Sequence, residues 1–331
     1  MNQQKLINDL NRVFNPNDKS VKQLIALINS SKSKQVADLS YFMNNGLQWN
    51  DKAKSEDVER VLNDLAQLKE NVLAHEQNGV DGLSAACAVI INNLPCETNA
   101  DVAKLKQRIN NVQLGLDSYD RLADKQSEIV DKTAEVVAKH VKPAPVNHHD
   151  EMDELTGTHF THYHPQATKR ALANVAYRNA TSETPVNLIF KRMNQLSIDL
   201  DNVVDYAMKN NANPKSMSSA LKDRMTQAQA DSLSDGKWEQ AVESAFDSEK
   251  GNLQRIFNTE CKARQTQANV KAYQNMGYRN IKVITRHSSK VCRYCMGMEQ
   301  KAMKITDVAL GVNVPPFHPY CCCNVIPVIM N

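Results

Sequence analysis

The sequence is poor in the residues that β-rich folds and membrane proteins need. Aromatic side chains make up 5% of the 331 residues, and glycine occupies only 10 positions, well below its average share of about 7%. Such a composition favours helices over a sandwich or a barrel. The longest apolar run, Ala85–Ile91, spans seven residues, whereas a membrane helix needs about 20. The polar, amphipathic N-terminus also argues against a secretory signal.

Net charge is unevenly distributed along the chain. The total is +3, but residues 251–331 contain 11 Lys/Arg and 3 Asp/Glu, a balance of +8, whereas the first 250 residues hold 29 and 34, a balance of −5. A basic end on an acidic body is typical of contact with an acidic partner or nucleic acid. The alternative is that metal-bound thiolates cancel part of this charge.

Hydrophobic periodicity divides the chain into three parts. Residues 1–141 form a helical N-terminal region, in which Ser55–His75 has apolar residues at helical spacing behind an acidic first turn. Residues 142–165 contain three prolines and five histidines without periodicity, which predicts a linker or long loop. Residues 166–331 form the third part.

Within that third part, helices are expected over 166–277, with Gly277 as the C-terminal stop, and a tail over 278–331. In the tail, Ile281–Thr285 has the pattern of a β-strand. Val325–Ile329 has the pattern of a short edge strand, because Pro327 cannot donate to a sheet.

The linker histidines offer imidazole groups that can bind a metal. The surrounding segment supplies no rigid support for such a site, so we expect a solvated polar loop there. The residues concerned are His148, His149, His159, His162 and His164.

Five of the eight cysteines fall in the last 40 residues. A disulfide scaffold would spread them through a short secreted chain, so the clustering predicts metal binding in a reducing compartment. The remaining three, Cys87, Cys96 and Cys261, are expected to be buried thiols rather than reactive ones.

The clustered cysteines have the spacing of a zinc site. Cys292 and Cys295 form a C-x2-C knuckle, in which both sulfurs can turn toward one ion. If residues 321–323 are extended, Cys321 and Cys323 face one way and Cys322 the other. With His318, five candidates then compete for four positions. Four ligands would close the zinc shell, which predicts a structural rather than a catalytic ion.

Two other interpretations of the cluster stay open at this point. The cysteines can be reduced and unliganded, or Cys292 and Cys295 can form a redox pair. The fold class expected with zinc is mainly α, with elongated helical N-terminal and middle regions and a small α+β C-terminal module stapled by the ion.

The order of these elements resembles a known family. Thr259-Glu260 opens a long helix that carries Tyr273 and stops at Gly277. A strand follows, then C-x2-C, then the run Pro315-Pro316-Phe317-His318-Pro319-Tyr320-Cys321-Cys322-Cys323. This is similar to the C-terminal module of the Mu F-like minor head proteins of tailed bacteriophages, also called phage head morphogenesis proteins. The similarity covers roughly residues 200–330. Two family positions differ: Cys322 replaces an arginine and Ser288 replaces a frequent acid.

The resemblance implies a minor capsid protein. Such a protein is made in the host cytoplasm, associates with the portal and with capsid or scaffold proteins inside the head, becomes part of the virion, and in some cases leaves with the DNA. From this resemblance, together with the closed zinc site and the short apolar runs, we expect a structural zinc ion and no enzymatic activity. We therefore expect no catalytic residues, no cofactor-binding residues, no small-molecule substrate and no membrane partner.

Two alternatives to this structural role remain. One is a DNA-binding protein inside the head, whose knuckle and basic tail contact phosphates non-specifically. The other, more remote, is a nuclease or toxin with His287 as general base, although such an enzyme needs a second metal-binding pair beside the knuckle.

Overall fold

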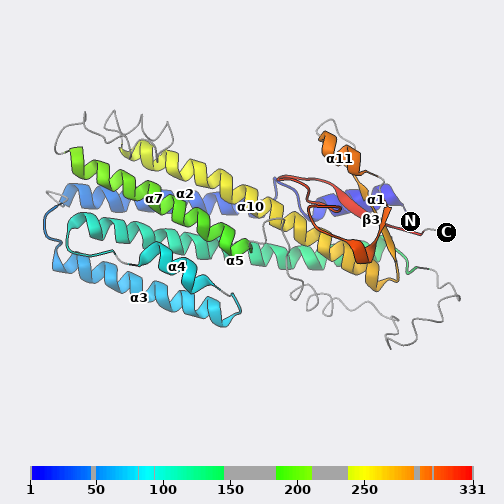
Figure 1. The fold of residues 1–331 in the computed structure, drawn as a ribbon, viewed down its shortest axis with the longest axis horizontal. Coiled ribbons are helices and arrows are strands. Elements are labelled where there is room, and N and C mark those ends of the chain that lie inside the picture. Colours follow the sequence, from blue (N-terminus) through cyan, green and yellow to red (C-terminus); the bar gives the residue numbers. More distant parts are fainter. Residues whose placement is uncertain are drawn as a thin grey trace. The chain divides into compact units, whose positions relative to one another are not determined.

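The computed structural model is mainly helical, with a small antiparallel sheet near the C-terminus (Figure 1). This confirms the mainly α class with an α+β C-terminal module. The described residues are 2–45, 50–80, 82–92, 94–144, 184–210, 238–286, 291–299 and 302–329.

Contacts divide the chain into two compact units, each built from separate segments. Unit 1 comprises Met1–Val21, Leu122–Thr184 and Arg255–Asn331, and unit 2 comprises Lys22–Arg121 and Pro185–Gln254. The boundaries fall within three helices: α2 (Lys19–Asn45), α5 (Asn99–His140) and α10 (Trp238–Asn275). Each unit therefore holds a part of each of these helices.

Unit 2 consists of helices in its described part. Besides its portions of the three shared helices it contains α3 (Ser55–Gln77), α4 (Leu83–Ile91) and α7 (Pro185–Asn210), with α4 packed against both α3 and α7. Helix α3 matches the predicted stretch and carries Glu56 and Asp57 in its first turn, where negative charge is favourable.

A glycine sets the packing between α5 and α7. The sequence shows two amphipathic stretches, Thr98–Gln107 and Ser118–His140, and the structure joins them in one helix through Gly115. A Cβ at that position would lie 2.9 Å from side-chain atoms of Met193 and Phe190, so only glycine permits this close approach. The structure therefore has one continuous helix where the sequence shows two stretches.

Unit 1 carries the sheet, in the order β2-β1-β3. Its strands are β1 (Asn280–Ile284), β2 (Ala302–Lys304) and β3 (Asn324–Val328), and both outer strands run antiparallel to β1. The structure confirms β1 and places Pro327 on an edge strand, opposite Ile281, as its missing N–H requires. Gly277 ends α10 with φ of +82°, as predicted. The predicted start at Thr259-Glu260 is wrong, because α10 begins at Trp238 and continues through these two residues.

Helix α1 (Gln3–Val13) lies beside β3 (Figure 1). Its buried side chains Leu6, Ile7 and Leu10 join the core formed by the sheet and the end of α10. In that core the fully buried Tyr273 donates a hydrogen bond to the Val325 carbonyl, 3.2 Å away. The tail is therefore anchored to the beginning of the chain.

No described helix has the length and apolar character needed to cross a membrane. The predicted linker at 142–165 lies outside the described residues from 145 onward, so the proposed division into regions at that point stays a prediction.

Candidate metal centre

The C-x2-C knuckle is formed by the start of a short helix in unit 1. Cys292 is the residue immediately before α11 (Arg293–Met298), and its sulfur accepts a hydrogen bond from the Cys295 backbone N–H at 3.4 Å. This cap turns both sulfurs to the same side. Cys292 is exposed, and Cys295 is buried.

The second half-site is a turn that leads directly into β3. The Cys321 N–H donates to the His318 carbonyl at 3.2 Å, and Tyr320 adopts a left-handed backbone with φ of 61°. Cys321 and Cys323 are both buried, while the Cys322 sulfur lies 3.5 Å from the Tyr320 carbonyl and contributes to a neighbouring cleft. Cys321 and Cys323 thus face the cluster and Cys322 faces the cleft, which is the alternation expected for adjacent extended residues.

The two half-sites meet at Cys295. Its sulfur lies 3.2 Å from His318 Nε2 and 3.9 Å from the Cys321 sulfur, and the Cys292 sulfur lies 3.3 Å from the same Nε2. The ligand atoms of Cys292, Cys295 and His318 lie within 4.8 Å of one another, and so do those of Cys295, Cys321 and Cys323. All five predicted candidates are thus brought together, with Cys295 common to both groups.

Three separations within the cluster are close to the edge lengths of a tetrahedral zinc site. With Zn–S bonds of about 2.3 Å and Zn–N bonds of about 2.0 Å, neighbouring ligand atoms should lie roughly 3.5–3.8 Å apart. The observed sulfur–sulfur and sulfur–nitrogen distances are within a few tenths of an ångström of that range. A disulfide, in contrast, requires about 2.05 Å between sulfurs, and all eight cysteines are free.

The histidine is held in the tautomer that a metal ligand needs. His318 Nδ1 lies 2.8 Å from the Pro319 carbonyl, which accepts the Nδ1 proton and leaves the Nε2 lone pair facing the sulfurs. A backbone carbonyl on the distal nitrogen is the usual support of a metal-bound imidazole.

The thiols of the cluster differ in acidity. The Cys295 N–H lowers the pKa of the exposed Cys292. A hydrogen bond from the Cys323 thiol lowers the pKa of Cys321 to about 5, and the same bond raises the pKa of Cys323. Burial and the neighbouring Cys321 raise the pKa of Cys295 to about 12. The thiols thus share protons around one thiolate, and a soft cation can take the place of these protons.

The part of the chain that contains this cluster matches a known protein family. Residues 200–326 match the family model described as phage Mu protein F like protein. The match confirms the resemblance found in the C-terminal module. No match was found among curated proteins or among solved structures.

The Mu F-like match contains every candidate ligand and the long helix α10. Cys322, which stands where the family has an arginine, points away from the ligand cluster. The replacement therefore leaves the ligand set untouched. The other departure, Ser288, lies outside the described residues, as does His287, so the nuclease alternative gains no support.

A buried lysine beside the cluster escaped the sequence analysis. The Lys262 ammonium, on α10, donates to Gln265 Oε1 at 2.8 Å and to Asn324 Oδ1 at 2.7 Å. Burial lowers its pKa to about 8, although the neighbouring cysteines Cys321 to Cys323 act in the opposite direction. A buried cation suits a site whose thiolates carry excess negative charge. No local pattern marks Lys262, because its role depends on β3, 62 residues further along.

The other predicted sites have separate outcomes. The five histidines of the linker segment all lie outside the described residues. Cys87 and Cys261 are buried, as predicted, and burial raises the pKa of both thiols.

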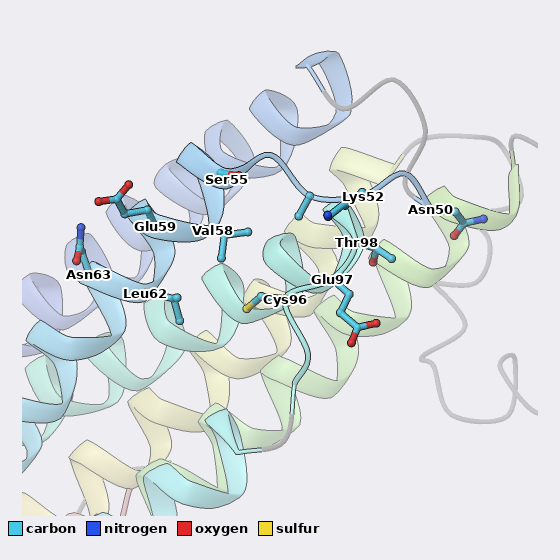
Figure 2. A pocket seen from close by; sticks show the side chains of 11 residues that line it. Asn50, Lys52, Ser55, Val58, Glu59, Leu62, Asn63, Cys96, Glu97 and Thr98 are labelled. Carbon is cyan, nitrogen blue, oxygen red and sulfur yellow. The ribbon is translucent and has the colours of Figure 1, made fainter.

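Cys96 differs from that prediction, because it is only half-buried. It lies between α4 and α5 and lines a pocket of about 850 Å³ in unit 2, together with Val58 and Leu62 of α3 (Figure 2). Burial and then the nearby Asp101 raise the pKa of the thiol, which keeps it protonated and weakly nucleophilic near neutral pH.

Proposed function

We propose that this chain is a structural minor head protein of a tailed bacteriophage, active in head morphogenesis. The match of residues 200–326 to the phage Mu protein F like family carries the proposal. In this role the C-terminal module is a rigid docking piece and performs no catalysis. The proposed location is the head interior, after synthesis in the host cytoplasm.

The proposed cofactor is one structural zinc ion, held by four of Cys292, Cys295, His318, Cys321 and Cys323. Two observations support zinc: the ligand types are soft thiolates with imidazole, and three of their separations are close to the edge lengths of a zinc tetrahedron. Four protein ligands leave no position for water or substrate, which is consistent with a structural role.

The metal proposal is tested by elemental analysis of the purified chain. We expect about one zinc per chain, and we expect Cys292→Ser or His318→Ala to weaken it if that residue is a ligand. A folded, metal-free native chain would contradict the proposal.

The proposed partners are the portal and the capsid or scaffold proteins. Heads assembled with and without the portal protein, then separated by sedimentation, test this assignment. We expect the chain in heads that contain the portal and its depletion in heads that lack it. Heads that never contain the chain at any stage of assembly would refute the structural role.

A second candidate function is non-specific DNA binding inside the head. The +8 balance of residues 251–331 favours it, and it is compatible with the structural role. Ejection with the genome would be a further consequence of such binding.

A further inference from the structure

A polar cleft in unit 1 lies beside the metal centre and is distinct from it. Helix α1 and the loop after it form one wall of the cleft, and Thr285 and Arg286 after β1 form the other wall together with Cys322. The volume of the cleft is about 610 Å³. We call it the α1 cleft and define it by Asn8, Asn11, Arg12, Asn15, Arg286 and Cys322. Among the described residues that line it, none is an aspartate or glutamate, whereas two are arginines.

A hydrogen-bond chain fixes the polarity of this cleft. The Lys262 ammonium can only donate, so the oxygen of Asn324 must face it, at 2.7 Å. The Asn324 amide NH2 therefore donates to Asn11 Oδ1, at 2.9 Å. The oxygen of Asn11 is thereby used, and its NH2 group is left as a donor for the cleft.

The loop after α1 adds a second oriented donor. Asn15 Oδ1 accepts the backbone N–H of Asn17 at 2.8 Å, which again assigns the oxygen inward and leaves the NH2 group of Asn15 as a donor. Two amide donors and the guanidinium groups of Arg12 and Arg286 thus line one cleft. Arg12 also pairs with Asp9 at 3.1 Å through one of its nitrogens, and a guanidinium has further N–H donors besides that one. Such a set favours an anion with several acceptor oxygens, of which phosphate is the common biological case.

A small cavity that shares lining residues with the cleft, here called the floor cavity, contains an unsatisfied amide. This cavity of about 20 Å³, roughly the room of one water molecule, shares Asn11, Asn15 and Arg286 with the cleft and is also lined by Asn258 and Lys262. Asn258 is 2% exposed, and neither of its amide atoms has a partner among the described residues. A buried amide without a partner is costly, and a bound water or an anion oxygen would satisfy it.

We propose that the α1 cleft binds phosphate groups of a nucleic-acid backbone. The proposal rests on the proposed place of the chain in a DNA-filled head, which supplies this ligand at high concentration. The half-exposed ring of Tyr320 lines the same floor cavity and offers a face on which a base can stack. Sequence preference is not expected, because phosphate contacts carry none.

The decisive variant is the pair Asn11→Asp and Asn15→Asp. Each aspartate keeps the oxygen that accepts the existing hydrogen bond and replaces only the outward NH2 group with a negative oxygen. We therefore expect the fold to be preserved, while the cleft loses two hydrogen-bond donors and gains two negative charges that repel phosphate. The control is the double variant Asn50→Asp and Asn63→Asp, which adds the same two negative charges at exposed positions of unit 2.

The measurement is fluorescence anisotropy of a labelled duplex and of its single strand with the full-length chain at about 50 mM salt. We expect salt-dependent binding, at least about tenfold weaker for the cleft pair, with the salt slope reduced by about one, and a change below about twofold for the control pair. Zinc content should be the same in all variants, which separates this proposal from that of the metal site.

Three results would overturn the proposal. The first is an absence of binding to either nucleic acid, and the second is equal weakening by the cleft pair and the control pair. The third is binding of polyglutamate but not of DNA, which would make the ligand an acidic protein segment. Because the assay needs no other head protein, failure to find the chain in heads would leave its outcome unaffected.

Discussion

Replacement of Cys295 by serine should weaken metal binding more than replacement of any other single candidate ligand. Cys295 is the residue shared by both ligand groups, 3.2 Å from His318 and 3.9 Å from Cys321. Structural zinc in small peptides contributes about 10–16 kcal/mol through four ligands. One ligand is then worth about 2.5–4 kcal/mol, a loss of roughly 70- to 800-fold in affinity.

The assay is competition for zinc with a chromophoric chelator at constant pH, together with hydrogen exchange of the amides in β1 and β3. Serine at a buried position also costs stability by itself, since it places a hydroxyl where a thiol was. Cys261→Ser measures that cost alone, because Cys261 is fully buried and remote in sequence from the knuckle. Cys322→Ser serves as the second control, and we expect unchanged zinc affinity from it.

Of the remaining four candidates, three should bind the zinc ion and one should not. Five residues compete for four positions, so exactly one of Cys292, His318, Cys321 and Cys323 should tolerate replacement with wild-type affinity. The reasoning is refuted if Cys295→Ser binds zinc as tightly as the wild type, or if Cys322→Ser weakens binding as much as Cys295→Ser does.

Two further predictions concern unit 2. Gly115→Ala should lower the free energy of unfolding by about 1–2 kcal/mol in a urea titration, because overpacking against α7 costs about 1–3 kcal/mol and exceeds the gain in helix propensity; Gly251→Ala, where a Cβ meets open space, should not destabilise. Burial opposes protonation of His75, but hydrogen bonds to a backbone carbonyl and to Asp120 outweigh it and raise its pKa. That contribution is complete below about pH 6.5 and disappears as pH rises through the folded pKa. In urea titrations, Asp120→Asn should therefore lower the free energy of unfolding by less than about 1 kcal/mol at pH 6 and leave it unchanged at pH 9. An equal effect at both pH values would contradict this prediction.

Local patterns predicted much of the fold because their causes are local. Gly277 ends a helix in the left-handed conformation that glycine permits, and Pro327 occupies an edge strand because it lacks a donor. The short β2 and α11 were missed, since three and six residues respectively are too few to show a period. The grouping of cysteines and His318 could be predicted because C-x2-C and the cysteine run are themselves local patterns.

Features that depend on distant partners had no such signal. The chain from Asn11 through Asn324 to Lys262 joins residues 313 and 62 positions apart, and each member alone is an ordinary polar residue in the sequence. Burial of a lysine in particular contradicts its usual exposure. Only the folded arrangement of α1, β3 and α10 shows why these residue types are required.

These hydrogen bonds, together with a shared apolar core, connect the C-terminal tail to helix α1. Cys295, Cys321 and Cys323 belong to the apolar core that also contains Leu6 and Leu10 of α1, since a protonated thiol packs as a small apolar group. Conversion of these thiols to thiolates would place negative charge in that core, which is tolerable only with compensating positive charge nearby. The proposed zinc ion would supply most of it, and the Lys262 ammonium adds one further positive charge. The hydrogen bonds from Lys262 to Asn324 and from Asn324 to Asn11 connect this region to α1. Removal of the metal should therefore destabilise α1 as well as the knuckle itself.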